Sequence, residues 1–428
     1  MTEENDSARN GGPRPAISHS GSAADIYRVQ PYYQRFNQKN NMIRQPLWNP
    51  EAAQKTRERF ENLSRMVKEN RKGYRLQDWA FYVGAMANMV NSGFVINSPN
   101  RRGNSWAPLS RRSEIQAASQ PYANYGKIEV DPAGASRFIK KVATQFGAHD
   151  VGFCVLDRQW VYSHWFDEET GRDYPIVFSD ESGYEACREP VQLDSGIQVI
   201  PKDMKYVVVL VHEMDVEGMS AAPTLTQMAT TLTTYSQISS TTVMIAEFIR
   251  GLGYNAIPSA NDTALSIPLA IDAGLGELSR NAKLIHPAFG PRCRISKVIT
   301  DLPLAVARPR MRGVTEFCSV CGKCARECPA GAISTGERSF EPLGSFSQSG
   351  VFQWQMDHLK CYNYWTRVGT NCGICIRVCP FNKPGHRVHD IARWFVRKRN
   401  REVDSLLARF DDVLGYGRFR DPDLFWED

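Results

Sequence analysis

The sequence predicts a layered α/β (α+β) domain that is followed by a smaller, cysteine-rich domain. From about Pro132 onward, short apolar segments alternate with segments of helical periodicity, as in domains whose helices cover a sheet. Eight of the 11 cysteines then fall between Cys318 and Cys379, at the short spacings of a metal site. The 428 residues, 42% of them hydrophobic, leave room for two or three domains.

The chain divides into five expected regions. These are a disordered tail (1–24), an irregular and helical region (25–135), the α/β domain (136–310), the cysteine domain (311–389) and a helical tail (390–428). The first region is rich in Gly, Ser, Pro and Asn, and it lacks the apolar stretch that a signal peptide contains. The second has two stretches of helical periodicity, at 50–70 and 76–90, and no pattern from which we predict chemistry.

The elements of the α/β domain can be placed in order. Residues 133–147 are expected to form a helix and residues 150–156 (DVGFCVL) a buried strand. Residues 205–212 (KYVVVLVH) form the clearest strand, because of their β-branched run. A long helix at about 224–252 ends at the glycines of GLG, and a strand at 254–258 follows. The next helix begins near residue 266 and leads into a glycine-rich turn.

The composition excludes some classes of protein. The most apolar run is far shorter than the roughly 20 residues that cross a bilayer. The net charge is only +6 and no Lys/Arg tract is present, so we expect no nucleic-acid partner.

Two cysteine motifs predict two [4Fe–4S] clusters. The first, CxxCxxCxxxCP, ends at Cys328-Pro329 and matches the bacterial ferredoxin run, in which the fourth cysteine ligates the other cluster. The second ends at Cys379-Pro380, and its first cysteine lies eleven positions upstream of the next one. The expected ligands are Cys318, Cys321, Cys324 and Cys379 for one cluster, and Cys361, Cys372, Cys375 and Cys328 for the other. Thiolates also suit zinc, but zinc knuckles rarely carry such a doubled motif.

The segment before the cysteines resembles a known family. Residues 251–304 contain LGY, NDT, AGLGE, FGPRxR and KVxTDL in that order, and the cluster motifs follow. Together they resemble the catalytic subunit of corrinoid-dependent reductive dehalogenases over about residues 131–389. The resemblance implies a nitroreductase-like domain that holds a cobalamin-type corrinoid base-off, without a histidine ligand to cobalt, beside a cluster. The DxHxxG motif of corrinoid proteins with such a ligand is absent here.

The resemblance also implies an active site. Motif by motif, the family's proton-donating tyrosine falls on Tyr235 in TTYSQ, its arginine on Arg294 in GPRCR, and its polar companion on Asn261 in NDT. Taken alone, Tyr235 would be a core residue on a helix face, Asn261 part of a turn or helix N-cap, and Arg294 a surface or salt-bridging residue. Arg292, two positions away, could be confused with Arg294.

Five further residues are expected to contact the corrinoid or to wall the substrate pocket. They are Thr263, the last residue of NDT, the turn glycines Gly274 and Gly276, and the aromatic Trp354 and Trp365. Core packing is the alternative for both tryptophans.

The implied reaction replaces a halogen of a small organohalide by hydrogen, in anaerobic respiration, with electrons from the two clusters and a proton from Tyr235. Chlorinated or brominated substrates are expected rather than fluorinated ones. The implied partners are an electron donor (reduced ferredoxin or flavodoxin, or a quinol-linked membrane protein), a small membrane anchor subunit and a second copy of the chain. No twin-arginine leader is present, so we expect a cytoplasmic protein, or an exported and membrane-associated one if a leader has been removed.

Two other functions remain open from the sequence. An epoxyqueuosine reductase-like enzyme acting on tRNA would share the cysteine domain, but it usually has a carboxylate as proton donor and helical repeats after the clusters. A plain 2[4Fe–4S] electron-transfer protein would bind no corrinoid.

Overall fold

The computed structural model describes residues 21–91, 106, 126–344, 346–383 and 387–427. Most of the expected disordered tail therefore lies outside the described residues. Its last residues belong to helix α1 (Ala23–Ile26), which Ser22 caps, and the Ala23 amide donates a hydrogen bond to Asp272 at 2.6 Å.

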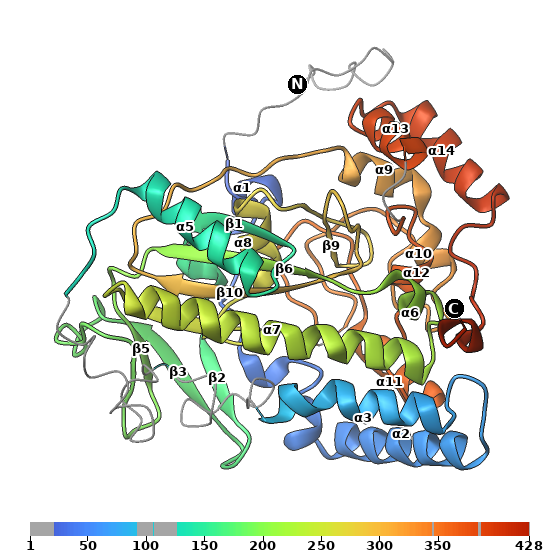
Figure 1. Cartoon of the computed structure of the whole chain (residues 1–428), viewed down its shortest axis with the longest axis horizontal. Helices are drawn as coiled ribbons and strands as arrows, with labels where there is room; N and C mark the ends of the chain where they lie inside the picture. The colour runs from blue at the N-terminus through green and yellow to red at the C-terminus, as the bar shows by residue number, and fades with distance from the viewer. Residues whose placement is uncertain (1–20, 92–105, 107–125, 345, 384–386, 428) are drawn as a thin grey trace, which may run out of the picture.

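The centre of the molecule is a four-stranded sheet in the order β1-β6-β10-β7, and every pair of neighbours is antiparallel. Alternate side chains of its strands point to opposite faces. Helices α5 and α7 cover one face, while α8 and α1 cover the other (Figure 1). The bounds are β1 (Asp150–Val155), β6 (Tyr206–Glu213), β10 (Cys293–Thr300), β7 (Ala256–Ser259), α5 (Pro132–Gln145), α7 (Leu225–Gly251) and α8 (Ser266–Asp272).

The expected helices and strands of this domain form where the sequence places them, within two residues at each end. Strand β10 was not expected, although it occupies an inner position in the sheet. Its sequence, CRISKVIT, carries Ser296 and Lys297 at positions that are fully buried in the structure, so it lacks the apolar run of an inner strand.

A second sheet and several short elements surround this centre. The second sheet has the order β2-β3-β5-β4, and the expectations from sequence contained none of its strands. The bounds are β2 (His164–Asp167), β3 (Arg172–Phe178), β4 (Val191–Gln192), β5 (Gln198–Ile200), the β8 (Glu277–Leu278) and β9 (Leu284–Ile285) ribbon, α6 (Val216–Ser220), and the 3-10 turns η1 (Gln38–Asn40), η2 (Gln45–Leu47) and η5 (Arg158–Trp160).

The region before residue 135 packs across the two domains. Helix α3 (Leu76–Asn91) runs along α7, and α2 (Pro50–Lys68) packs against α11 (His358–Val368) of the cysteine domain. The N-terminal region therefore contributes side chains between the sheet domain and the cysteines.

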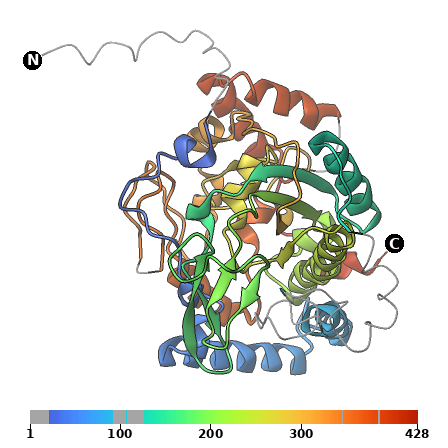
Figure 2. The same cartoon turned by 90° about the vertical axis from the view of Figure 1, so that its left-hand side faces the viewer.

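The cysteine domain contains α9 (Val314–Cys321), α10 (Lys323–Arg326), α11 and α12 (Ile374–Arg377), and the tail forms α13 (Arg387–Val396), α14 (Arg401–Val413) and η6 (Pro422–Phe425). In both views α13 and α14 (red) lie at the top of the molecule and α2 (blue) at the bottom (Figure 2). The chain end returns to α3, where Phe425 stacks on Phe81 at 5.5 Å. Among the described helices, none is long and apolar enough to cross a bilayer.

Candidate functional site

Three side chains from three elements meet at one end of the sheet domain. Tyr235 lies in the middle of α7, Asn261 follows β7, and Arg294 is the second residue of β10. The Asn261 amide donates to the Tyr235 hydroxyl at 3.0 Å, and the Arg294 guanidinium lies over the Tyr235 ring, 5.2 Å from its centre. The structure therefore brings together the three predicted catalytic residues, from positions up to 59 residues apart in the chain.

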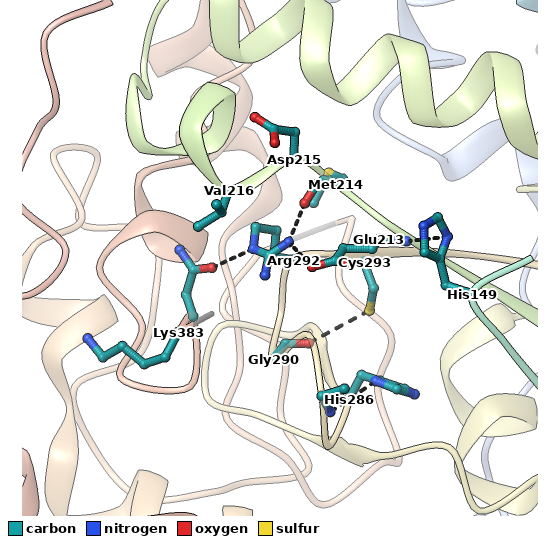
Figure 3. A network of polar contacts seen from close by, with 12 residues as sticks. His149, Glu213, Met214, Asp215, Val216, His286, Gly290, Arg292, Cys293 and Lys383 are labelled. Atoms are coloured by element: carbon teal, nitrogen blue, oxygen red, sulfur yellow. Dashed lines mark hydrogen bonds and ion pairs between the residues drawn. The ribbon is translucent and has the colours of Figure 1, made fainter. Parts of the chain in front are cut away.

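The neighbouring Arg292 has a different role. It is fully buried, and its guanidinium donates to Glu213 at 2.5 Å, to the Met214 carbonyl, and to the Asn382 side chain at 3.0 Å (Figure 3). Because Asn382 follows the last cluster motif, these contacts of Arg292 link the start of β10 to the cysteine domain. Arg292 lies one residue before β10 and Arg294 within it, and their different surroundings separate their roles.

A buried lysine supports the loop that carries Asn261. Lys297 is fully buried, and its ammonium donates to the Ala260 carbonyl at 2.5 Å and to the Ser266 hydroxyl at 3.0 Å. The Ala260 amide in turn donates to the Asp262 carboxylate at 2.5 Å. Burial lowers the pKa of Lys297 to about 8, and the nearby Asp262 carboxylate opposes that shift.

Tyr235, Asn261 and Arg294 border a cavity of about 280 Å³. Trp365, one of the two predicted tryptophans, lines the same cavity. So do residues of the N-terminal region, for which the sequence analysis predicted no chemistry: Asn41, Ile43, Arg44, Arg59 and Met89. One signal was present, because Arg59 falls on the buried stripe of α2 with Ala52, Leu63 and Met66.

A larger cavity of about 430 Å³ adjoins the first, since Asn41 and Asn261 line both. Its walls are largely aromatic and aliphatic, with the amide side chains of Gln348, Gln353 and Gln355 among them. Trp354, the second predicted tryptophan, lines this cavity. Its indole N–H and the Tyr33 hydroxyl are buried and have no hydrogen-bond partner in the described part of the chain.

The remaining predicted contacts line neither cavity. Gly274 and Gly276 are instead constrained by packing: a Cβ on Gly276 would lie 2.5 Å from the Ile285 carbonyl oxygen, and Gly274 has a φ of +73°. Thr263 is buried with a φ of +60°, and its carbonyl accepts a hydrogen bond from the Tyr162 amide at 2.8 Å. Backbone shape is what the structure shows for these three residues, and their contact with a corrinoid stays a prediction.

The eight cysteines gather in the two expected groups. One group lines a cavity that shares Arg294 and Asn371 with the Tyr235 cavity, and Met356 with the larger one. The other group lines a separate space beneath α9. The first group is Cys328, Cys361, Cys372 and Cys375, and the second is Cys318, Cys321, Cys324 and Cys379.

Two side chains of the β8–β9 turn hold the cysteine loops in place. The Arg280 guanidinium donates to the Cys318 carbonyl at 3.1 Å, and the Asn281 amide donates to the Cys375 carbonyl at 2.9 Å. Each reaches a different cysteine group, so this turn fixes the two groups relative to the sheet domain. The sequence analysis did not predict either contact.

Comparison with known proteins identifies the family. Residues 54–304 match the family model of the reductive dehalogenase subunit, and residues 317–382 match a 4Fe–4S double cluster binding domain. The chain belongs to the reductive dehalogenase family. It is 39% identical over 307 residues to a tetrachloroethene reductive dehalogenase of Sulfurospirillum multivorans, and 36% identical over 310 residues to one of Desulfitobacterium hafniense. These alignments cover 69% and 68% of this chain but 60% and 55% of the relatives.

Solved structures of reductive dehalogenases share the fold. A catabolic reductive dehalogenase superposes with a TM-score of 0.62 at 22% identity, covering 91% of this chain and 47% of that one. A second structure, whose title describes B12-dependent dehalogenation, has a TM-score of 0.53 at 25% identity and covers 70% and 41%. By contrast, the match to an epoxyqueuosine reductase of Listeria monocytogenes extends over 130 residues, which is 29% of this chain.

Proposed function

We propose that the chain is a corrinoid-dependent reductive dehalogenase, in which Tyr235 gives the proton that replaces the halogen. The observation that carries the proposal is the meeting of Tyr235, Asn261 and Arg294 at the junction of two cavities, beside one of the cysteine groups. The smaller cavity is the proposed substrate site, and the larger one is the proposed cofactor site.

The larger cavity has the chemistry of a corrinoid site. A corrin is an apolar ring fringed with amides, and the cavity combines apolar walls with the side-chain amides of Gln353 and Gln355 and the unpaired donors of Tyr33 and Trp354. A bound, reduced corrinoid supplies a strong nucleophile and electron donor for a carbon–halogen bond. His358 also lines this cavity, and burial lowers the pKa of its imidazole to about 4. Because a histidine lies in the proposed cofactor site, base-off binding without a histidine ligand to cobalt is a separate part of the proposal.

The three polar side chains have complementary tasks. Asn261 donates to the Tyr235 oxygen, so the phenol's own proton points elsewhere and is available for transfer. After transfer the phenolate carries a negative charge. The Arg294 cation over the ring and the Asn261 N–H both stabilise that charge.

The cysteine groups are proposed to hold the two clusters, each with one cysteine from the other motif. Four soft thiolates at one point suit a [4Fe–4S] cube. The group that contains Cys328 and Cys361 adjoins both cavities, so its cluster would pass electrons to the cofactor.

Several finer points stay with this proposal. Chlorinated or brominated organohalides are the proposed substrates, because the carbon–fluorine bond is stronger. A reduced ferredoxin, a flavodoxin or a quinol-linked membrane protein would supply electrons. A membrane anchor subunit, a homodimer and a role in anaerobic respiration are further parts of the hypothesis.

The first test is the cofactor content of the protein purified without oxygen and with corrinoid supplied. We expect about eight iron atoms and one cobalt per chain, the content of two cubane clusters and one corrinoid. The same iron without cobalt in a folded protein would point to plain electron transfer instead.

Replacing Tyr235 by phenylalanine tests the proton donor. Tyr235→Phe removes one hydroxyl and keeps the ring under Arg294, so iron and cobalt should stay bound while dehalogenation falls by roughly 100-fold or more. The matched control is Tyr254→Phe, because that hydroxyl donates to the Ile128 carbonyl and the residue lines neither cavity. Full activity in Tyr235→Phe would remove Tyr235 from the mechanism.

A further inference from the structure

The substrate cavity contains a buried arginine without a counter-ion. Arg59, on α2, is 8% exposed and lines the cavity. No carboxylate of the described residues lies within ion-pair distance of it, and its Nε has no hydrogen-bond partner there. Its contacts are uncharged: Nη2 donates to the Met228 sulfur at 3.6 Å, the Tyr362 hydroxyl is a hydrogen-bond partner, and the guanidinium lies 5.3 Å from the centre of the Trp365 ring.

The other charges around the cavity do not balance Arg59. Arg44 forms an ion pair with Glu168 and also lies near Asp262, the carboxylate of the cavity wall. Arg294 has no carboxylate partner in the described part of the chain, and its Nε is also buried and unpaired. The walls formed by the described residues therefore carry an excess of two positive charges.

An uncompensated buried cation is costly, and a bound anion would offset that cost. Burial lowers the pKa of Arg59 in the direction expected for a cation that lacks a partner, and the nearby tyrosines Tyr362 and Tyr82 oppose the shift only in part. The fork of N–H groups on a guanidinium matches a carboxylate in particular.

We propose that the substrate is a small halogenated aromatic anion, and that Arg59 binds its carboxylate or ionised hydroxyl. The inference rests on the proposed function and adds the substrate class. A cavity of about 280 Å³ lies just below the usual range for drug-sized ligands and suits a single ring, against which Trp365 can pack.

The positions of the two ends predict which isomer reacts. Arg59 contacts Met228, and Met228 precedes Tyr235 by seven residues on the same helix. At 1.5 Å per residue these positions are roughly 10 Å apart along α7. Because the two side chains meet the cavity at well-separated positions of this helix, we expect the charged group and the reacting carbon–halogen bond to lie at opposite ends of the ring. A halogen para to the charge fits this spacing, and an ortho halogen does not.

The test compares an anion with its neutral isostere in the holoenzyme. Calorimetry would measure the binding of 4-bromobenzoate and 4-bromobenzamide, and bromide release would measure turnover. We expect the benzoate to bind about 10- to 100-fold more tightly in the wild-type protein, the range for a buried charge-assisted contact, and 2-bromobenzoate to be a poor substrate. Arg59→Gln should remove the preference for benzoate.

The control is Arg65→Gln on the same helix, because Arg65 is 64% exposed and touches only surface groups. It should keep the preference. Arg59→Lys retains the charge and should keep part of the preference for benzoate. This variant tests the inference if Arg59→Gln does not fold. Equal affinity for the two probes in the wild-type protein, or an unchanged preference in Arg59→Gln, overturns the inference.

The failure of this inference and that of the proposed function look different. Release of bromide from bromobenzamide without any preference for the benzoate would refute the anion site alone. Arg59-dependent binding of the benzoate by a cofactor-loaded protein that releases no halide from any substrate would refute the dehalogenase and leave the anion site standing.

Discussion

Single buried side chains decide the geometry of the site. Tyr235 and Asn261 touch the cavity, but the backbone that presents Asn261 is held by Lys297 from the sheet. A fully buried ammonium is costly unless its hydrogen bonds are made, and here the Ala260 carbonyl and the Ser266 hydroxyl accept them. Lys297 therefore acts as a positioning residue for Asn261.

Lys297→Met should lower kcat by roughly 10- to 100-fold with little change in KM, because Asn261 would shift relative to the Tyr235 hydroxyl. Iron and cobalt content should be unchanged. Adding Lys297→Met to Asn261→Ala should cause little further loss, since both act on the same contact. Additive losses in the double variant would mean that Lys297 acts elsewhere, for example on overall stability.

At the level of the elements, a buried charge cluster attaches helix α14 to the cysteine domain. The Asp411 carboxylate of α14 lies 2.6 Å from the ammonium of Lys323 and 2.6 Å from that of Lys383. All three side chains are less than 10% exposed. Lys323 lies between two cysteines of the second group, and Lys383 follows its last one, so this cluster supports the loops of one proposed iron–sulfur site.

Asp411→Asn would leave the buried Lys383 ammonium facing a neutral amide and the Lys323 ammonium with the more exposed Asp412. We expect a destabilisation of about 3–5 kcal/mol, seen as a lower midpoint of thermal unfolding, together with a loss of iron. The neighbouring Asp412 also pairs with Lys323, but it is 45% exposed, so Asp412→Asn should change the midpoint only slightly. Equal effects of the two changes would show that burial is not the cause.

At the scale of the whole molecule, the two cysteine motifs are interlocked. Cys328 from the first motif joins the group of the second, and Cys379 from the second joins the group of the first. Helix α2 packs on α11 beside one group, and the β8–β9 turn contacts both. Sheet domain, N-terminal region and cysteine domain therefore surround the cavities as one unit.

Cys328→Ser should affect only the cluster beside the cavities. We expect the iron content to fall from about eight to about four atoms, or to a value that shows a three-iron cluster, while the other cluster keeps its electron paramagnetic resonance signal. Dehalogenation should be lost. Cys187→Ser, at a cysteine outside both groups, serves as the control and should retain full iron. Loss of the signal from the cluster of Cys318 instead would reverse the ligand assignment.

The sequence by itself determined the cluster chemistry, the main elements of the sheet domain and the family. Cysteine spacing within a motif is a local property, because a loop of three or four residues wraps one cube. The strand at β6 and the helix α7 also follow from local pattern, in their β-branched run and their capping residues. The motifs that contain Tyr235, Asn261 and Arg294 predicted three side chains that the structure brings together.

The tertiary structure alone decided which surfaces face one another. It separated Arg294 from Arg292, placed the Cys328 group beside the cavities and left the turn glycines outside the linings of both cavities. It also brought Arg59 from a segment without a recognisable motif into the proposed substrate cavity. Such contacts join residues that are far apart in the sequence. Their energies depend on burial and on the partners supplied by other elements, and a local sequence pattern predicts neither the burial nor the partners.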